Sequence, residues 1–535
     1  MKLKQNATEE KITGTYYTPY KMADFIVSNL VSIDKKSYVL EPSCGDGVFY
    51  DALRFRETEF KEADFVEINK EACEVLKEKN QYTNLFVSNC DFFDFLKANK
   101  KRYDCIIGNP PYIRYQYLNE QQRKEISELL NSNGMKPNKL TNAWVAFVVG
   151  CTTLLSESGE LALVIPGELL SVGYASQLRS YLLREYEEIN VYTFRKLIFE
   201  DLQQDTIILH CKKKSDKKGI RIVESDDIES LINESLESFD YHDFPENVKL
   251  KWVNFLSKKG DSTFKNLPFV KLNKYCLINV GLTTGNNAFF SLDSDRTQRY
   301  ELEKYVVPLV GKSSHAKCCV FTQNDYLTNL NEGKNSNLLL IPDVSLEQLP
   351  AGLKKYLEIG VSSKINEGYK CAIRKHWYCI PSIWYPDAFF QRRCGDNPKL
   401  VLNDCHAIST DTMHRLKFYD ESNKKLITSI FYNSVTFASA EMCGRSYGGG
   451  VLEILPSEAG EVMIPDVELI KGKIDVDAFL EQIDLLIRNS DSYDNVVRYV
   501  DKTILIDILG LSSECCEKYF LMWKDMLSRR LSRSK

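Results

Sequence analysis

Residues 109–112 read Asn-Pro-Pro-Tyr and combine groups that could bind an amino group on a flat ring. They follow an apolar run at 103–108, which predicts a buried strand. The two prolines end this strand and stiffen the backbone at its carboxyl end, where ligands bind in open α/β sheets. The side-chain oxygen of Asn109 and the carbonyl of Pro110 can each accept one N–H, and Tyr112 can lie against the ring. The competing interpretation is a proline turn with a packed tyrosine.

A glycine loop lies earlier in the chain, within residues 38–49. An apolar strand enters this loop through Glu41, and a helix is expected to leave it. Gly45 lets the backbone approach a ligand closely, and the N-terminus of the helix favours an anionic group. Ser43 stands where such loops often carry a first glycine, and Cys44 follows it. The segment therefore predicts a loop that binds a cofactor.

Acidic residues close the next two predicted strands. One strand ends in Glu67 and Ile68, and the following strand ends in Asp91 and Phe92. A carboxylate at the end of the second strand can accept both hydroxyls of a ribose. Asp91 is placed to accept an adenine amino group, with Phe92 beside the ring. The alternatives are a solvated acid at a strand end and a surface aspartate.

The first helix is predicted to start at Thr18 and Pro19, an N-cap followed by proline at the first helical position. Met22, Phe25 and Leu30 then repeat on one helical face. Taken alone, this stretch is an ordinary capped helix.

Taken in order, these motifs resemble those of amino-group methyltransferases that use S-adenosylmethionine. With a further domain after them, they are similar to the gamma (TaqI-like) type of DNA adenine-N6 methyltransferase from type II restriction–modification systems. The resemblance implies S-adenosyl-L-methionine as cofactor, bound by Thr18, Glu41, Ser43, Cys44, Gly45, Glu67, Ile68, Asp91, Phe92 and Asn109. It implies a catalytic set of Asn109, Pro110, Tyr112 and Phe199. Phe199 would be a second aromatic residue over the target base, and a core phenylalanine is its rival interpretation.

The second half of the chain interleaves cations with aromatic residues and lacks repeated strand–helix alternation. Glycine turns at 281–290 and 444–450 can offer backbone N–H groups and hydroxyls to phosphates. Arginine can read guanine edges, lysine can pair with phosphates, and rings can wedge or stack. Solvated charge beside core aromatics explains any single position about as well. The candidates for DNA contact are Thr284, Asn286, Arg374, Lys375, Trp377, Arg392, Arg393 and Arg445.

The expected fold class is α/β. A Rossmann-like S-adenosylmethionine-dependent methyltransferase domain is expected at residues 1–246, and a mixed α+β DNA-recognition domain at residues 247–465. From about Asp475 the pattern is that of amphipathic helix, so residues 466–535 are expected to form a C-terminal helical segment. A chain of 535 residues is long enough for two or three cores.

Composition limits the location and the partners. The net charge of −5 argues mildly against nucleic acid, but a binding face needs only a local basic patch. No run approaches the roughly 18 apolar residues of a membrane span, and the basic N-terminus lacks the apolar region of a signal peptide. A cytoplasmic location is therefore expected. The resemblance implies double-stranded DNA and S-adenosylmethionine as partners, and the protein is expected to be a monomer. A companion restriction endonuclease acting on the same site is left open.

No metal is expected, because the 16 cysteines form no C-x-x-C pair. The tightest cluster, His315 with Cys318 and Cys319, lacks a second pair of ligands nearby, so buried thiols are favoured over zinc.

The expected reaction is methyl transfer to N6 of a flipped-out adenine without a covalent intermediate, so Cys105 is interpreted as a buried strand residue. An RNA methyltransferase would share the Asn-Pro-Pro-Tyr motif. A protein-glutamine methyltransferase would share it too, but would not need the long second half. The non-enzymatic alternative is a DNA-recognition subunit with a decayed catalytic half. A fused nuclease is disfavoured because Asp466, Glu468 and Lys471 lack E-x-K spacing.

Overall fold

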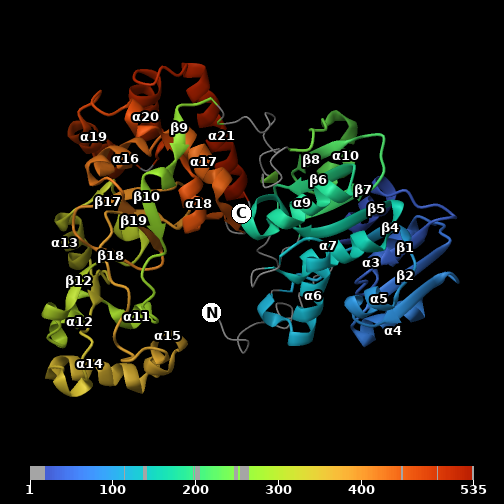
Figure 1. Ribbon diagram of the computed structural model, residues 1–535, viewed down its shortest axis with the longest axis horizontal. Helices are drawn as coiled ribbons and strands as arrows, with labels where there is room; N and C mark the ends of the chain where they lie inside the picture. Colours follow the sequence, from blue (N-terminus) through green and yellow to red (C-terminus); the bar gives the residue numbers. More distant parts are fainter. Residues whose placement is uncertain are drawn as a thin grey trace. The chain divides into compact units, whose positions relative to one another are not determined.

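The computed structural model shown in Figure 1 describes residues 18–113, 115–136, 141–196, 198, 205–245, 251–252, 264, 266–447, 450–490 and 492–532. The chain divides into a first unit, Met1–Thr263, and a second unit, Phe264–Ser446 together with Gly450–Leu531. Each unit has hydrophobic cores of its own.

The first unit is built on one sheet of eight strands in the order β3-β2-β1-β4-β5-β7-β6-β8. Neighbours from β3 to β5 are parallel, while β7 runs antiparallel to both β5 and β6. The strand order reverses between β1 and β4, and such a switch point is where open α/β sheets bind ligands. The strands are β1 Tyr38–Glu41, β2 Glu62–Glu67, β3 Leu85–Asn89, β4 Tyr103–Gly108, β5 Leu155–Pro166, β6 Glu188–Phe194, β7 Thr206–Lys212 and β8 Gly219–Ser225.

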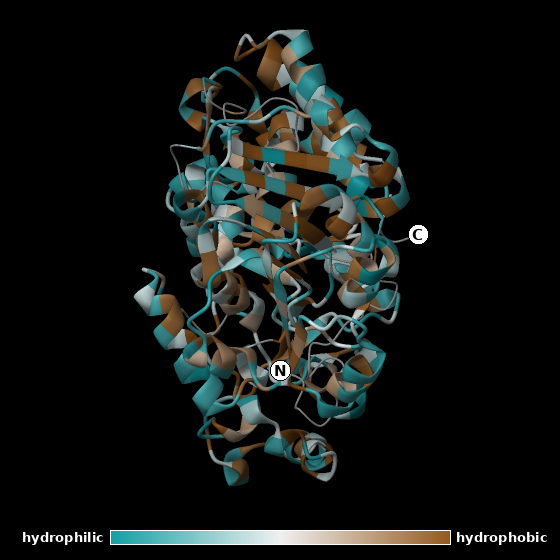
Figure 2. Cartoon of the chain, turned by 90° about the vertical axis from the view of Figure 1, so that its right-hand side faces the viewer, coloured by the Kyte–Doolittle hydropathy of each residue, from teal (hydrophilic) through white to brown (hydrophobic). Residues whose placement is uncertain are grey.

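Helices of the first unit pack on this sheet through their apolar faces. The helix α7, Ala143–Leu154, is apolar almost all round and is buried along nearly its whole length, as its composition requires. Figure 2 shows mainly hydrophobic residues along the strands, with hydrophilic residues prominent on the surrounding helices. The other helices are α2 Tyr20–Phe25 continued by η2 Ile26–Leu30, α3 Val48–Phe55, α4 Lys70–Lys79, α5 Phe92–Ala98, α6 Glu120–Ser132, α8 Glu168–Ser171, α9 Ser176–Glu185 and α10 Ile228–Asn233.

Two local predictions need correction. Helix α2 begins at Tyr20 with Pro19 as its N-cap, so Thr18 lies before the cap and its side chain does not cap the helix. The third strand ends at Asn89, and Asp91 instead caps α5 by accepting a hydrogen bond from Phe93 N at 2.8 Å. Helix α2 thus begins one residue later than predicted, and β3 ends two residues before Asp91.

The second unit contains small sheets in place of one large sheet. Five strands pair in the order β10-β19-β15-β17-β13, and four pair in the order β11-β14-β12-β18. Two further sheets have the orders β16-β21-β20 and β22-β9. The bounds are β9 Phe269–Lys271, β10 Cys276–Asn279, β11 Ser291–Leu292, β12 Val306–Val310, β13 Val320–Phe321, β14 Asn337–Leu339, β15 Ala388–Gln391, β16 Arg393–Cys394, β17 Leu400–Asn403, β18 Ile408–Ser409, β19 Met413–Phe418, β20 Arg445–Tyr447, β21 Val451–Glu453 and β22 Met463–Pro465.

Two groups of helices cover these sheets. Buried residues of α16, α17, α19, α20 and α21 share one core with β10, β15, β17 and β19, so the C-terminal helices belong to this core. Helices α11, α14 and α15 contribute to a second core. The bounds are α11 Asn287–Phe290, α12 Ser294–Arg299, α13 Gln323–Asn331, α14 Ala351–Ser362, α15 Tyr369–Ala372, α16 Lys424–Ile430, α17 Ser434–Cys443, α18 Pro456–Glu461, α19 Val476–Arg488, α20 Asp494–Val500 and α21 Ser513–Ser532.

Within the described ranges, no helix is long and apolar enough to cross a membrane. The same residues contain no group of three or more His, Cys, Asp or Glu side chains that could hold a metal ion.

Candidate active site

The glycine loop and the Asn-Pro-Pro-Tyr motif leave adjacent parallel strands. Val39 of β1 pairs with Cys105 of β4, so the two strands end side by side. The hydroxyl of Ser43 donates a hydrogen bond to the backbone carbonyl of Asn109 at 3.1 Å. The predicted cofactor loop therefore touches the predicted catalytic motif directly. We call the ends of β1, β2 and β4, with Glu41, Ser43, Gly45, Glu67 and Asn109, the cofactor edge.

The loop needs its glycines. Gly45 and Gly47 have φ of +50° and +85°, a region that other residues adopt only with strain. A Cβ on Gly47 would also lie 2.7 Å from Leu76 Cδ1 of α4. Among the described residues, only atoms of its chain neighbours lie within 4 Å of the position of a Cβ on Gly45. Backbone at Gly45 thus borders open space at the cofactor edge.

Glu67 closes β2 and holds the loop. Its Oε2 accepts a hydrogen bond from Gly45 N at 2.8 Å, and its Oε1 accepts one from Asn69 N at 2.7 Å. A carboxylate has about four acceptor sites, so each oxygen can still accept a hydroxyl. Ile68, next to Glu67, is exposed and could cover a ring. This arrangement fits the predicted binding of a ribose diol.

Glu41 is the most unusual group of the cofactor edge. It is 1% exposed, and its Oε2 has no hydrogen-bond partner among the described residues. Burial, followed by the nearby charges of Glu67 and Asp46, raises the pKa of Glu41 well above its ordinary value. A buried carboxyl without a partner is costly, and a ligand with a polar or cationic group would supply one. Together with the open space at Gly45, Glu41 fits a cofactor with an ammonium or sulfonium centre.

The other predicted cofactor residues contact protein groups in the structure. Asp91 is half-buried, and its Oδ2 accepts a hydrogen bond from Gln122 Nε2 at 3.4 Å. Phe92 is buried and stacks on Phe147 of α7, with ring centroids 4.7 Å apart. Cys44 is buried, and its backbone N–H donates to a carbonyl of β2. Phe92 is thus part of the core, and its contact with a cofactor ring stays a prediction.

The catalytic motif is fixed on both sides. Before it, a Cβ on Gly108 would lie 3.1 Å from Pro42 Cδ, so the end of β4 fits closely against the start of the loop. After it, Ala143 N at the start of α7 donates a hydrogen bond to Ile113 O at 2.9 Å. Pro110 is buried, Asn109 is half-buried and Tyr112 is 8% exposed. Phe199 lies outside the described residues.

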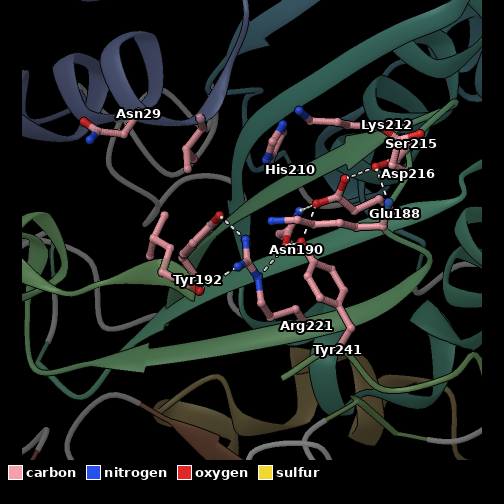
Figure 3. A pocket seen from close by; sticks show the side chains of 13 residues that line it. Asn29, Glu188, Asn190, Tyr192, His210, Lys212, Ser215, Asp216, Arg221 and Tyr241 are labelled. Atoms are coloured by element: carbon pink, nitrogen blue, oxygen red, sulfur yellow. Dashed lines mark hydrogen bonds between the residues drawn. The ribbon is translucent and has the colours of Figure 1, made fainter. Parts of the chain in front are cut away.

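A second polar site lies in the first unit and was not predicted. It is a cavity of about 280 Å³ against β6, β7 and β8, lined by Glu188, Asn190, His210, Arg221 and Tyr241 among others (Figure 3). Arg221 Nε donates to Asn190 Oδ1 at 2.7 Å, and the Tyr241 hydroxyl donates to Glu188 and Asn190. The alternation of polar residues along β6 was its only signal in the sequence. This network joins β6 and β8 to Tyr241, which follows them in the chain.

In the second unit, two predicted DNA-contact segments meet. Arg374 Nη2 donates a hydrogen bond to Thr284 O at 2.8 Å, and Thr284 itself is buried. Asn286 caps α11 by accepting from Phe289 N at 3.0 Å. The Trp377 ring packs on Phe289 with centroids 5.6 Å apart. Arg374, Asn286 and Trp377 therefore build the unit itself, while Lys375 is exposed.

Three predicted arginines are paired with acids. Arg392 and Arg393 both donate from Nε to Glu453 Oε1, at 3.1 and 3.0 Å. Arg445 donates to Glu458 Oε1 at 2.9 Å. Both glutamates are buried. Sequence reasoning missed these two acids. Glu453 lies far along the chain from Arg392 and Arg393, and Glu458 lies among ordinary helical residues.

The fold and the cofactor edge together define an S-adenosylmethionine-dependent methyltransferase, with S-adenosyl-L-methionine as methyl donor. Residues 26–199 match the family described as Eco57I restriction-modification methylase. Residues 250–505 match the family described as Type II methyltransferase M.Eco57I, C-terminal domain. The two matches together span most of the chain, and both are to Eco57I-like restriction–modification methylases.

Individual proteins resemble the chain over most of its length. Type II methyltransferase M.AccI of Acinetobacter calcoaceticus is 24% identical, over 91% of this chain and 92% of that protein. Type II methyltransferase M.HindII of Haemophilus influenzae is 27% identical over 60% of this chain and 64% of that protein. The Type IIL restriction-modification enzyme MmeI, solved in complex with DNA, has the same fold with a TM-score of 0.59 and 15% identity, covering 98% of this chain and 80% of that chain.

Proposed function

We propose that this chain is a site-specific DNA methyltransferase that transfers a methyl group from S-adenosylmethionine to N6 of an adenine. The supporting observation is the contact between Ser43 and the Asn109 carbonyl, which joins the cofactor loop to the Asn-Pro-Pro-Tyr motif. A methyl donor in the loop and an amino group at the motif would then be neighbours. The similarity to named type II methyltransferases supports DNA as the substrate.

The motif would activate the amino group by accepting its hydrogens. The adenine N6 lone pair is delocalised into the ring, which makes it a poor nucleophile. Asn109 Oδ1 and Pro110 O would each accept one N–H and favour a pyramidal nitrogen whose lone pair is free. Bound S-adenosylmethionine supplies the methyl group on a positively charged sulfur.

A covalent route through the nearby thiol is disfavoured. Cys105 is wholly buried in β4, and burial raises the pKa of its thiol well above the ordinary value. A nucleophilic cysteine must be a thiolate and must reach the substrate. Direct methyl transfer needs neither a thiolate nor a cysteine that reaches the substrate.

The target adenine would have to leave the duplex to reach the cofactor edge, at a cost of roughly a few kcal/mol. Tyr112 is proposed to stack on the flipped base and offset part of that cost. Phe199 is proposed to approach the other face of the ring.

We further propose a division of labour within a type II restriction–modification system. Residues 1–246 would carry catalysis, residues 247–465 would recognise the DNA sequence, and residues 466–535 would support that recognition. The protein would act as a monomer, and a companion endonuclease would cut the same site when it is unmethylated.

The test identifies the product chemically. The purified protein is incubated with S-adenosylmethionine and unmethylated genomic DNA, and with RNA and protein acceptors in parallel, and nucleosides and amino acids are analysed by mass spectrometry. N6-methyladenine in DNA is expected. Methylated cytosine in DNA, or methylation of only RNA or glutamine, would contradict the proposal.

An Asn109→Ala variant connects this product to the motif. The rate should fall by about 10²–10³-fold, by analogy with the loss of one oxyanion-hole donor. Cofactor affinity should change far less, because the side chain of Asn109 is proposed to face the target amino group. Asn131→Ala, on the exposed surface of α6, is the matched control. Wild-type turnover of Asn109→Ala at saturating cofactor would remove Asn109 from the mechanism.

A further inference from the structure

Helix α15 of the second unit exposes two large apolar side chains. Tyr369 is 75% exposed and Ile373, which directly follows the helix in helical conformation, is 64% exposed. Residues four apart lie on the same helical face, so the two side chains project together. Cys371, between them, points the other way and is buried. Neighbouring exposed apolar side chains form a small patch, and larger patches of this kind mark interaction sites.

The support beneath α15 is rigid. A Cβ on Gly285, which has φ of +93°, would lie 2.8 Å from Cys371 Sγ, so only glycine fits the turn on which the helix rests. Arg374 ties the helix to the same turn through Thr284 O. Because the backbone of α15 is held by this packing, binding a partner would mainly order the side chains of Tyr369 and Ile373.

The charges around α15 are positive in a chain of negative net charge. Between residues 364 and 376 the chain carries Lys364, Lys370, Arg374 and Lys375 against the single acid Glu367. The three lysines are exposed, and none forms an ion pair with any residue that the structure describes. Lys370 Nζ lies 5.9 Å from the centroid of the Tyr369 ring, and no acid neutralises the three lysines, unlike the arginines paired with Glu453 and Glu458.

We propose that this surface, made of Tyr369, Ile373, Lys364, Lys370 and Lys375, contacts duplex DNA. The lysines would pair with phosphates, and Tyr369 with Ile373 would wedge against the base pairs in a groove. Lysine is depleted from protein–protein interfaces, whereas DNA-contact surfaces are strongly positive, which favours DNA over a protein partner. The inference rests on the proposed function. It gives Arg374 and Trp377 a structural role within the second unit.

Two variants separate the two parts of the surface. Tyr369→Ala/Ile373→Ala removes the wedge, and Lys364→Gln/Lys370→Gln/Lys375→Gln removes the charges. Tyr419→Ala is the matched control, because Tyr419 is 67% exposed in the same unit but lies beside Asp420 and Glu421. Affinity for a duplex containing the methylation site is measured by fluorescence anisotropy at several salt concentrations. Cofactor affinity and melting temperature show that each variant is folded.

The wedge variant should lose about tenfold or more in duplex affinity with the salt dependence kept. The lysine variant should reduce the slope of log K against log salt by about 2 to 3. The Tyr419 control should bind like the wild type. Wild-type affinity and salt slope in both surface variants, in a protein that methylates DNA, would overturn this inference alone. A wild-type protein that neither binds nor methylates DNA, or a surface that binds only RNA, would overturn the proposed function with it.

Discussion

The cofactor edge of the first unit and the arginine segments of the second unit were both predicted from residue types, with different results. At the cofactor edge, Glu41, Ser43, Glu67 and Asn109 come from the ends of three strands and meet. In the second unit, Arg392 and Arg393 form ion pairs with Glu453.

The difference lies in the regularity of the two units. In a parallel sheet, every strand delivers its last residues to the same edge, so a residue's place relative to its strand predicts its place in space. The second unit is built of short strands that pair in small sheets, and no repeat relates its segments. Arg392 and its acid Glu453 are 61 positions apart. Local composition can find charged residues there but not their partners.

The largest effect on cofactor binding is expected at Glu67. Glu67→Ala should weaken S-adenosylmethionine binding, because a charge-assisted hydrogen bond is worth roughly 1.5–3 kcal/mol, or about 10- to 100-fold in affinity. The same change frees Gly45 N, so the loop should also lose order. Calorimetry measures the affinity, with the exposed acid Glu71→Ala as control. Unchanged cofactor affinity would show that Glu67 only holds the loop, and the cofactor edge would lose its ribose site.

A smaller effect separates the two neighbouring arginines. Arg392→Ala should lower the free energy of unfolding by on the order of 2 kcal/mol, because it leaves the buried Glu453 short of a charged donor. Arg393→Ala should cost less than about 1 kcal/mol, since the Arg393 side chain is 67% exposed. Urea unfolding of both variants measures the difference. If Arg392→Ala kept full stability and lost DNA affinity, Arg392 would be a reader of DNA, and the contrast between the two regions would fail.

Several elements of the first unit could be predicted because their patterns are strong. The strands ending at Glu67 and before Asn109 both formed where the apolar runs indicated. The cap at Thr18 and the strand at Asp91 were displaced because a proline and an aspartate can each start a helix at more than one position.

Burial was the property that the sequence could not supply. Phe92 is an aromatic residue next to a candidate acid, yet its ring stacks in the core. Tyr369 and Ile373 are apolar, yet they are exposed on α15. Asn190 and Arg221 are polar, yet they are buried in a network on the sheet that the sequence did not predict. In each case packing against distant segments decided the outcome.

The central claim is that the cofactor edge methylates adenine at one sequence chosen by the second unit. The most direct measurement is single-molecule sequencing of genomic DNA from a methylation-deficient host that expresses the full chain, with Asn109→Ala as the negative control. The account predicts N6-methyladenine at nearly every copy of one short sequence, and none with the variant. Modified cytosine, or methylated adenines that share no sequence, would contradict it.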